Sequence, residues 1–511
     1  MGGPADATQI RAIGTSMAEG QITSRAKDYA QWYQDVISAA QLAEPAGVVR
    51  GCMVVRPHGW AIWEKIQAEL DSRFKATGHQ NAAFPLLIPL SFLQKEAQHA
   101  TGFAMECAVV THAGLKAVDG KIELKSELEE PYVVRPTSET IIGHFFAKWI
   151  DSYRDLPMLL NQWGNVMRWE LRTRLFLRTG EFWWQEGHTA HSTHEEAREE
   201  VMRMLDVYRD VYHDVLAVPV IRGRKSENEK FAGALETYCV EALMQDGKSL
   251  QGATSHDLGQ NFGKAFNVTF QNKEGVRDFV WQTSWGASTR MIGALIMAHS
   301  DDGGLVLPPK LAPIHVAIVP IWKSDAERAQ VLEAASKLAA ELREDGLSVK
   351  LDDRDAMRPG EKYYEWERKG VPLRLEVGPR DVASGTALGK TRISQAKEKV
   401  KVPFQDVGVH VGALLDSMQR ELFERALAFR KANTVSVDAW SDFEAVFADQ
   451  GSKYVLAHWD GTTETELAIK DATKATIRCV PLAAEGFSVE PGRCIKTGKP
   501  SAQRVLFAKN Y

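Results

Sequence analysis

The chain has 511 residues, and single hydrophobic cores stop growing at roughly 250 to 300 residues, so we expect three domains. Hydrophobic residues make up 44% and charged residues 25%, which is typical of a globular protein and excludes a fibrous or disordered class. With 62 basic and 67 acidic side chains the net charge is −5, which neither predicts nor excludes nucleic-acid binding, because binding depends on where positive charge is placed.

The cysteines and the amino terminus indicate a reducing compartment. The five cysteines are odd in number and lie far apart, which argues against a disulfide framework. The first twenty residues lack the apolar segment of a signal peptide, and no apolar run is long enough to span a bilayer. We therefore expect a cytoplasmic protein with no membrane partner.

The amino-terminal region predicts two helices. An arm over residues 1–55 carries a first helix that ends before Pro45. A second helix over residues 59–77 stops at Gly78, a typical C-cap residue, and the apolar run 84–89 then predicts a strand. One face of the second helix is apolar at four-residue spacing, through Ile62, Ile66, Leu70 and Phe74.

The sequence YVVRPTSET joins a β-rich run to Thr137, Ser138 and Glu139, which precede an apolar helix. A hydroxyl followed by a glutamate can cap the start of that helix. The same groups at a strand-to-helix turn are also well placed to hold an ammonium group. The local sequence leaves both interpretations open.

The stretch 168–188 is the richest in candidate binding groups. Arginine presents a planar fork of donors to phosphate or carboxylate, and aromatic rings offer flat faces to a base. The stretch therefore predicts a nucleotide site, and a solvated basic hairpin is the alternative. Its arginines and the groups behind them are Arg168, Arg172, Arg174, Arg178, Phe182, Trp183, Trp184, Gln185, Glu186 and His188.

His188, His191 and His194 follow one another at three-residue spacing, but no cysteine or fourth ligand stands nearby. A zinc centre is therefore not predicted there. The next helix, to about residue 216, starts with carboxylates that suit the helix dipole. Its apolar face consists of Val201, Leu205, Tyr208 and Tyr212.

A later segment places polar groups among small residues. Gln251, Thr254 and His256 stand in SLQGATSHDLG, and Ser284 stands in TSWGASTR, before Arg290 and an apolar helix. An arginine at a helix start behind small residues can reach a phosphate, although such an arginine is about as often simply solvated.

From residue 313 strands alternate with helices, which predicts a small α/β domain with a mostly parallel sheet over residues 313–408. Its basic loops either meet a polyanion or form a solvated charged face. Residues 409–511 begin with a helix over 414–433 and end in short strands, as a third compact α/β unit. The basic residues are Arg354, Arg358, Lys362, Arg368, Lys369 and Arg380.

Together these segments resemble the class II aminoacyl-tRNA synthetases, and within them the prolyl-tRNA synthetases of the archaeal and eukaryotic-like type. Residues 59–89 resemble motif 1, residues 168–188 motif 2 and GASTRMIG motif 3. The strings RPTSET, FLRT, EFWWQEGH, QGATSH and TSWGASTR are specific to the proline enzymes. The resemblance spans nearly the whole chain.

The resemblance implies an overall α/β fold and a homodimer. The catalytic domain, residues 56–312, is expected to be α+β, with an antiparallel sheet of six or seven strands flanked by helices. Residues 313–408 would be the anticodon-binding domain, and 409–511 the family's small carboxy-terminal domain. The implied activity is the ATP- and Mg²⁺-dependent activation of L-proline to prolyl-adenylate, followed by transfer to tRNA(Pro).

The resemblance also implies the role of each site residue. Attack of a carboxylate on the α-phosphorus builds negative charge, so fixed cations are needed, and Arg168 and Arg290 would supply them. Glu170 and Glu181 could carry Mg²⁺. The ATP-binding residues would be Arg168, Glu170, Arg178, Phe182, Gln251, Thr254 and Arg290. The proline-binding residues would be Thr137, Glu139, Arg168, Trp184, His188, His256 and Ser284. The anticodon contacts would be Arg354, Lys362 and Arg380.

Two departures from related enzymes stand out. Bacterial-type enzymes carry an editing domain between motifs 2 and 3, whereas here that interval is predicted to be continuous catalytic core. Relatives also bind a structural zinc through four cysteines, where this chain has Asp460, Thr465, Cys494 and Thr497. One thiolate cannot build a closed tetrahedral site, so we expect a zinc-free remnant held by packing. The terminal Tyr511 matches the family, whose last residue folds back toward the catalytic domain.

The sequence argues against two other functions. A synthetase-like regulatory protein without catalysis would have no reason to keep Arg168, Arg178 and Arg290. An amino-acid adenylating enzyme that loads a carrier protein would not need the anticodon-like domain.

Overall fold

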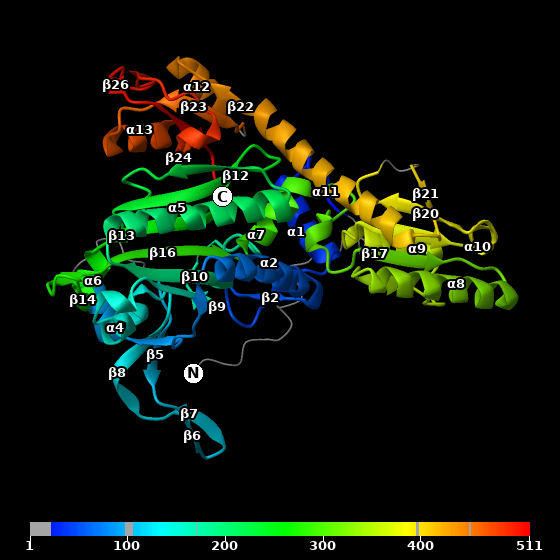
Figure 1. Ribbon diagram of the computed structural model, residues 1–511, viewed down its shortest axis with the longest axis horizontal. Coiled ribbons are helices and arrows are strands. Elements are labelled where there is room, and N and C mark those ends of the chain that lie inside the picture. The colour runs from blue at the N-terminus through cyan, green and yellow to red at the C-terminus, as the bar shows by residue number, and fades with distance from the viewer. Residues whose placement is uncertain (1–21, 98–105, 171, 395–397, 449–450) are drawn as a thin grey trace, which may run out of the picture.

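The computed structural model describes residues 22–97, 106–170, 172–394, 398–448 and 451–511. A sheet of 11 strands crosses the molecule in the order β22-β23-β27-β24-β11-β12-β13-β16-β10-β9-β3 (Figure 1). The first part of the expected amino-terminal arm, residues 1–21, lies outside the described residues.

The catalytic part of this sheet confirms the predicted fold class. Its seven strands pair antiparallel except for the parallel pair β3–β9. The interval between motifs 2 and 3 contributes β11, β12 and β13 to this layer, as the continuous core that the sequence predicted. The strands are β3 (Gln80–Asn81), β9 (Met158–Met167), β10 (Glu181–His191), β16 (Trp281–Ser288), β13 (Ser249–Gly259), β12 (Glu236–Leu243) and β11 (Val220–Arg224).

Four carboxy-terminal strands extend the same sheet, so the tail is less separate than the sequence indicated. The free edge of β11 pairs with β24 at Gly223 and Arg224. Because an exposed edge strand is a liability, this pairing closes the catalytic sheet while joining the two units. The added elements are β24 (Thr476–Pro481), β27 (Arg504–Ala508), β23 (Tyr454–His458) and β22 (Thr434–Ser436), with α12 (Trp440–Phe447), α13 (Thr463–Thr473) and the hairpin β25 (Gly492–Arg493) and β26 (Pro500–Ser501).

Helices cover the catalytic sheet. In α5 (His194–Asp210), a capping box between Thr193 and Glu196 starts the helix, and α7 (Arg290–His299) begins at the predicted arginine. All four apolar residues predicted for the face of α2 (Pro57–Ala76) are buried, and Gly78 adopts a φ of +92° just past the helix end.

The first helix is shorter than predicted. α1 (Tyr29–Ala39) stops six residues before Pro45, because Gln41 turns the chain with a φ of +56°. The residues expected to finish the helix instead form β1 (Ala43–Pro45), which pairs with β2 (Met53–Val55).

A smaller layer lies beneath the sheet in Figure 1, where the β6–β7 hairpin projects from the body. Its strands are β4 (Leu87–Pro89), β8 (Glu127–Val134), β5 (Val109–His112), β6 (Leu115–Val118) and β7 (Lys121–Leu124). Its helices are α3 (Leu90–Ala97), α4 (Glu139–Trp149) and α6 (Asn261–Phe266), beside the hairpin β14 (Thr269–Gln271) and β15 (Arg277–Phe279).

The α/β lobe at the right of Figure 1 has a mixed sheet, in the order β18-β17-β19-β20-β21. The prediction of a mostly parallel sheet is wrong: β17 pairs parallel with β18 and β19, but β19–β20 and β20–β21 are antiparallel. A left-handed turn at Gly385 sends β20 directly back along the sheet. The elements are β17 (Val316–Pro320), α8 (Asp325–Glu344), β18 (Val349–Leu351), α9 (Pro359–Arg368), β19 (Leu373–Val377), α10 (Pro379–Ser384), β20 (Thr386–Thr391) and β21 (Val400–Pro403).

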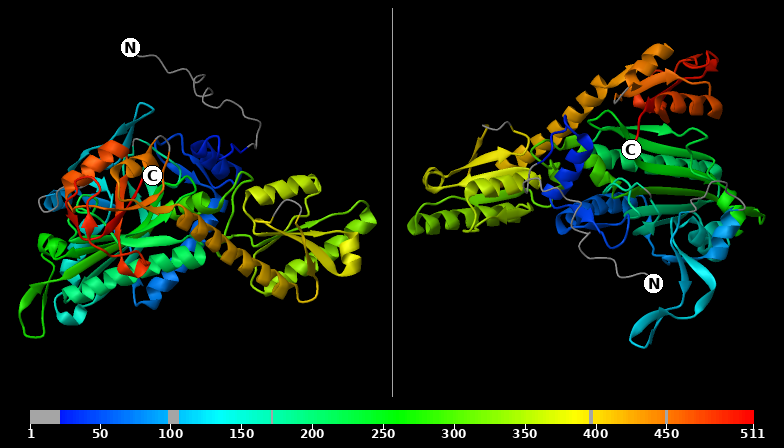
Figure 2. Two further views of the ribbon diagram at one scale, coloured as in Figure 1. Left: turned by 90° about the horizontal axis from the view of Figure 1, so that it is seen from above. Right: turned by 180° about the vertical axis from the view of Figure 1, so that it is seen from behind.

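The long helix α11 (Val407–Ala432) runs from this lobe to the carboxy-terminal strands, and both views of Figure 2 show it bridging the two. Gln419 on α11 donates to the carbonyls of Asp214 and Val215, at 3.1 Å each. α11 therefore also packs against the catalytic layer along its middle.

Partly buried His299 makes the fold sensitive to acid. Its ring lies 2.8 Å from the carbonyl oxygen of Leu216, and burial lowers its pKa from 6.5 to about 4. In the unfolded chain His299 is protonated as the pH falls through about 6.5, whereas in the folded chain it is protonated only near pH 4. The contribution of neutral His299 to stability is therefore lost as the pH falls between those values.

We predict that His299→Gln flattens the fall in the free energy of unfolding between pH 6.5 and 4.5, measured by urea denaturation at several pH values. The matched control is His410→Gln, at an exposed position on α11. An unchanged slope in the His299 variant would contradict the assignment.

Candidate active site

The middle strands of the large sheet bring distant residues into one row. His188 on β10 lies opposite Ser284 on β16, and Ser284 lies opposite His256 on β13. Side chains at alternate positions of a strand share a face. On β10 that face carries Phe182, Trp184, Glu186 and His188.

This face lines a cavity of about 320 Å³, within the usual size of a small-molecule site. The structure brings every residue predicted for ATP or proline into its lining, from segments that are far apart in the sequence. These residues are Thr137, Glu139, Arg168, Glu170, Arg178, Phe182, Trp184, His188, Gln251, Thr254, His256, Ser284 and Arg290.

Two arginines in the cavity lack a carboxylate partner among the described residues. Arg168 donates through Nε to the carbonyl of Pro136 at 2.9 Å, and Arg290 donates through Nε to the carbonyl of Leu177 at 3.1 Å. Neither forms an ion pair with another described residue, whereas Arg178 lies 3.6 Å from Glu170. The outer nitrogens of both guanidinium groups are thus left for a ligand.

The positive charges of Arg178 and Arg168 repel that of Arg290. Burial lowers the pKa of Arg290, and the positive charges of Arg178 and Arg168 lower it further. Burial also lowers the pKa of Arg168, against the pull of Glu139 and other carboxylates. Because like charges repel one another, a polyanion bound in the cavity would relieve this repulsion.

Three further cavity residues have buried polar atoms without a hydrogen-bond partner in the described chain: Trp184 and Trp285 through Nε1, and Ser284 through Oγ. Buried polar groups are almost always paired in native proteins. These three atoms are therefore candidates for hydrogen bonds to a bound molecule.

The capping box considered for the start of α4 does not form. Ser138 is the N-cap residue but makes no side-chain capping bond, because its hydroxyl donates to Glu186 at 2.5 Å. Thr137 donates its hydroxyl to the Glu139 carboxylate. The hydroxyl and carboxylate at this turn thus face each other beside the cavity.

Glu186 is a cavity residue to which the sequence analysis assigned no role. Its carboxylate accepts from Ser138, from Gln162 Nε2 at 2.9 Å, and lies 3.1 Å from His188 Nε2. Burial raises its pKa, but these contacts outweigh burial and hold the pKa below the ordinary value. Glu186 stands two residues from both Trp184 and His188, so the alternation of side chains along a strand could have placed it on the same face as these cavity residues.

The cavity shifts the pKa values of its two histidines in opposite directions. Burial disfavours protonation of His188, but the carboxylates of Glu186 and Glu139 raise its pKa above the ordinary value. Burial and then the charge of His188 lower the pKa of His256 to about 3. Thr237 Oγ1 lies 2.9 Å from His256 Nδ1. The site therefore favours protonation of His188 and disfavours protonation of His256.

Three family models match the chain. Residues 121–299 match the tRNA synthetase class II core domain (G, H, P, S and T), residues 315–410 the anticodon binding domain, and residues 440–511 the prolyl-tRNA synthetase C-terminal domain. Curated relatives named proline–tRNA ligase include one from Porphyromonas gingivalis, 56% identical over 96% of this chain and 99% of its own. Another, from Flavobacterium johnsoniae, is 54% identical with the same coverage.

Among solved structures, the chain is similar to a prolyl-tRNA synthetase from Cryptosporidium parvum complexed with halofuginone and AMPPNP. The TM-score is 0.89 at 39% identity, over 96% of this chain and 99% of that one. The chain belongs to the prolyl-tRNA synthetase family. The resemblance recognised in the motifs is thereby confirmed.

In this prolyl-tRNA synthetase fold the carboxy terminus reaches the catalytic layer. The hydroxyl of Tyr511 donates to Asp246 at 2.6 Å, and the guanidinium of Arg174 lies 5.9 Å from the Tyr511 ring. The backbone of Arg174 pairs with Arg178 in the cavity loop. The side chain of Arg174, although exposed, therefore packs on the last residue of the chain.

The predicted anticodon residues lie in different environments. Lys362 is buried, and its ammonium donates to the carbonyl of Asp352 at 2.9 Å. Arg354 pairs with the carboxylates of Asp352 and Glu365 while its side chain stays 40% exposed. Arg380, at the start of α10, is exposed.

The region for which the sequence predicts a zinc-free remnant is organised around one carboxylate. Asp460 Oδ2 accepts from the hydroxyls of Thr465 at 2.9 Å and Thr497 at 2.8 Å, and its Oδ1 accepts from Thr462 at 2.9 Å. Burial raises the Asp460 pKa, but these hydroxyl groups lower it more. Cys494, three residues before Thr497, is buried. Hydrogen bonds thus join Asp460 to all three hydroxyl groups.

We predict that Glu186→Gln lowers the pKa of His188, because the amide removes the negative charge that favours the imidazolium. The measurement is an NMR titration of the histidine ring protons. Glu229→Gln, which changes another carboxylate of the cavity lining, is the control. A His188 pKa unaffected by Glu186→Gln would refute the interpretation.

We also predict that Asp460→Ala destabilises the protein by about 1 kcal/mol, because three hydroxyls lose their acceptor. Urea denaturation measures the change, with the exposed Asp471→Ala on α13 as control. Metal analysis of the unmodified protein is expected to find only trace zinc. Near-stoichiometric zinc, or an Asp460 variant as stable as the control, would contradict the hydrogen-bonded cluster as the stabilising element.

Proposed function

We propose that this protein activates L-proline with ATP to form prolyl-adenylate and transfers the prolyl group to tRNA(Pro). The single observation that carries the proposal is a pair of partly buried guanidinium groups, Arg168 and Arg290. They have no carboxylate partner among the described residues, and they lie in a cavity that also holds Thr137 and Glu139. Such a cavity suits a triphosphate on one side and a small ammonium compound on the other.

The proposed chemistry needs fixed positive charge rather than a proton-transferring base. The prolyl carboxylate attacks the α-phosphorus, the bond to the leaving pyrophosphate breaks, and negative charge grows on the phosphate oxygens between these events. Arg168 would stabilise that charge beside the amino acid, while Arg178 and Arg290 would hold the outer phosphates. Phe182 would stack on the adenine, with Gln251 and Thr254 near the ribose.

The amino-acid pocket is proposed to recognise a secondary ammonium group. Proline offers two N–H donors, for which Glu139 supplies a carboxylate and Thr137 a neutral acceptor. Trp184 would form a flat wall for the ring, together with His188, His256 and Ser284. The neutral state of His256 avoids a second positive charge next to the substrate ammonium.

Magnesium fits this site in the manner usual for nucleotide enzymes, through one or two carboxylates and the substrate phosphates. Glu170 lines the cavity and would hold the ion, which would neutralise phosphate charge when bound. Glu181 does not line the cavity, and its carboxylate accepts a hydrogen bond from Asn165 at 2.6 Å. Its proposed contribution to Mg²⁺ binding is therefore secondary.

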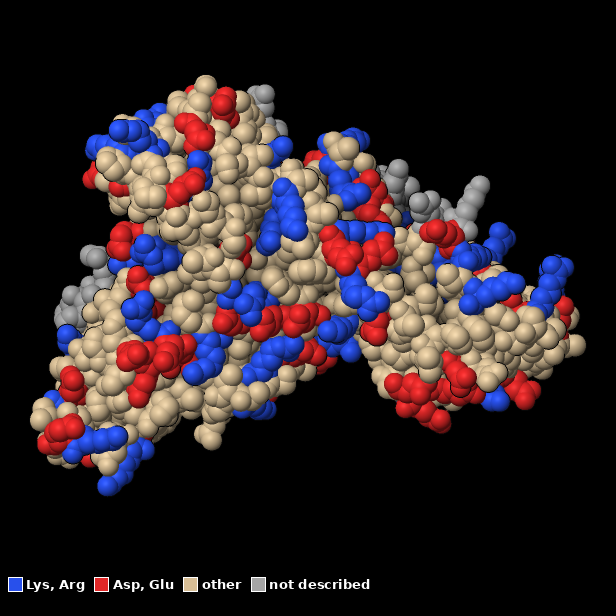
Figure 3. Space-filling model, turned by 45° about the horizontal axis from the view of Figure 1, so that its top comes forward, with Lys and Arg blue, Asp and Glu red and all other residues tan. Residues whose placement is uncertain are grey.

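We propose that the lobe over residues 313–408 reads the anticodon through Arg354 and Arg380, and that Lys362 supports Asp352 from within. In Figure 3 basic side chains project along the upper edge of this right-hand lobe, and acidic ones gather along its lower edge. A polyanionic RNA is attracted to the basic edge.

The remaining organisation follows from the same proposal. The domains would be the arm 1–55, the catalytic domain 56–312, the anticodon-binding domain 313–408 and the carboxy-terminal domain 409–511. We propose a cytoplasmic homodimer that pairs through the motif 1 region, and no resident zinc. None of the described helices has the length and apolar character needed to cross a membrane.

The decisive experiment is proline-dependent exchange of labelled pyrophosphate into ATP, followed by charging of purified tRNA. We predict exchange with proline, and a loss of at least about 100-fold in Arg168→Ala, because the reacting phosphate loses a buried cation. The exposed Arg172→Ala is the matched control and is expected to retain exchange.

Near-normal exchange in Arg168→Ala would overturn the role of Arg168. No proline-dependent exchange in the unmodified protein would overturn the function itself. Exchange without tRNA charging would favour an enzyme that loads a carrier protein.

A further inference from the structure

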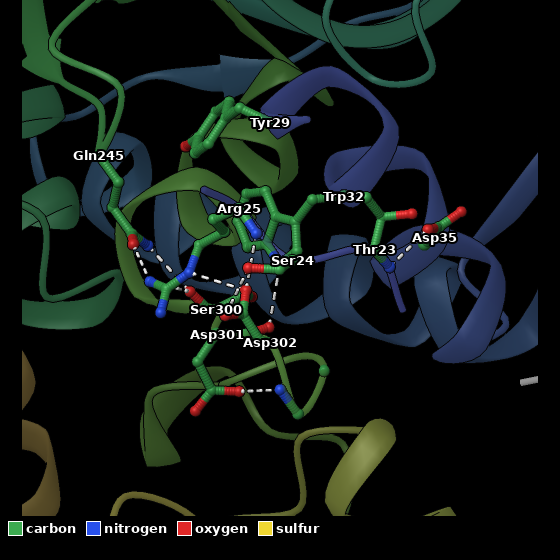
Figure 4. A network of polar contacts seen from close by, with 12 residues as sticks. Thr23, Ser24, Arg25, Tyr29, Trp32, Asp35, Gln245, Ser300, Asp301 and Asp302 are labelled. Carbon is green, nitrogen blue, oxygen red and sulfur yellow. Dashed lines mark hydrogen bonds and ion pairs between the residues drawn. The ribbon is translucent and has the colours of Figure 1, made fainter. Parts of the chain in front are cut away.

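The amino-terminal helix α1 and the residues before it meet the segment that follows α7 (Figure 4). Arg25 donates to Asp302 Oδ1 from its backbone nitrogen at 2.9 Å and from Nε at 3.2 Å. The indole of Trp32 donates to the carbonyl of Asp301 at 3.0 Å. The guanidinium of Arg25 also contacts Gln245, which itself donates to the carbonyl of Ser300 at 2.9 Å. The amino-terminal arm thus binds the segment after α7, at the end of the catalytic domain.

The anticodon-binding lobe is fastened to the same segment by Arg392. Its two outer nitrogens form a bidentate pair with the Asp301 carboxylate, at 2.9 and 2.6 Å. Its Nε donates to the carbonyls of Leu305 and Glu367 at 2.9 and 3.0 Å, and only 3% of the side chain is exposed. A bidentate arginine pair sets direction as well as distance, so it fixes the orientation of the lobe.

The other side of α1 reaches the loop between β9 and β10, which carries Arg178 and is called the ATP loop below. Next to Trp32, the hydroxyl of Tyr33 donates to the carbonyl of Leu175 at 2.8 Å, and Tyr33 is 3% exposed. Two residues further along the loop, the carbonyl of Leu177 accepts from Arg290. The loop that carries Arg178 is therefore held from α1 and from α7 together.

These contacts form a continuous path from the anticodon lobe to the nucleotide site. Arg392 binds the carboxylate of Asp301, Trp32 binds the carbonyl of the same residue, and Tyr33 binds the ATP loop. In parallel, α7 joins Asp301 to Arg290 as a rigid element of roughly 15 Å. A rotation of the lobe that moved Asp301 would therefore act on the loop at both Leu175 and Leu177.

We propose that Asp301, Trp32 and Tyr33 are positioning residues that transmit the placement of the tRNA-bound anticodon lobe to the ATP loop. None of them lines the cavity, so they act through Leu175 and Arg290 rather than on the substrate. The inference rests on the proposed function and deepens it. It differs from a purely structural brace in one respect: the path matters chiefly when tRNA is bound.

The test uses full-length Asp301→Asn, which removes the charge that holds Arg392 and keeps the carbonyl that binds Trp32. We expect kcat for tRNA charging to fall by about tenfold, with KM for tRNA and tRNA-independent exchange within about twofold of the unmodified protein. Asp438→Asn, which breaks an arginine pair in the carboxy-terminal unit, is the control and should change none of these.

A second experiment combines Asp301→Asn with Tyr33→Phe. Tyr33→Phe alone is expected to raise KM for ATP by about threefold. If both residues lie on one path, the double variant loses less charging activity than the product of the single losses. Multiplicative losses would overturn the proposal, as would an equal fall in exchange and charging for Asp301→Asn. Absence of proline-dependent exchange in the unmodified protein would instead refute the proposed function.

Discussion

The register between β10, β16 and β13 is the constraint on which the active site depends. It sets His188, Ser284 and His256 in one row, although they come from three separate parts of the chain. A shift of one residue along any of these strands would turn its cavity side chains to the other face. The helices α5 and α7, packed on the sheet, hold that register through burial of apolar side chains such as Tyr208 and Ile292.

Positive charge is the second organising feature of the site. Arg168 and Arg290 are partly buried near Arg178, and each donates only its Nε to a backbone carbonyl. In the same cavity the negative charge of Glu186 favours protonation of His188. Arg168 and Arg290 form no ion pair with a described residue, and the free energy that this costs becomes binding energy when phosphates bind.

The carboxy-terminal unit is bound to the catalytic sheet by a buried ionic cluster as well as by strand pairing. Glu241 on β12 accepts from Lys225 at 2.8 Å and from Arg478 on β24 at 3.0 Å. Burial raises the pKa of Glu241, but the two cations outweigh it and hold the pKa at about 2. Tyr511, from the same unit, packs against Arg174, so the carboxy-terminal tail and the amino-terminal arm both contact the loop that carries Arg178.

The sequence by itself determined the α/β class, the helices with clear apolar periodicity and the residues of the cavity, because motif strings such as RPTSET and TSWGASTR carry the chemistry in contiguous runs. It did not reveal that β20 and β21 run antiparallel, that residues 43–45 leave the first helix to pair with β2, or that β24 joins β11. Those outcomes depend on pairing between strands distant in sequence. The role of Glu186, the burial of Lys362 and the path through Asp301 were likewise decided only by tertiary structure, because a charged side chain acquires its partners, its pKa and its exposure from neighbours that no local pattern encodes.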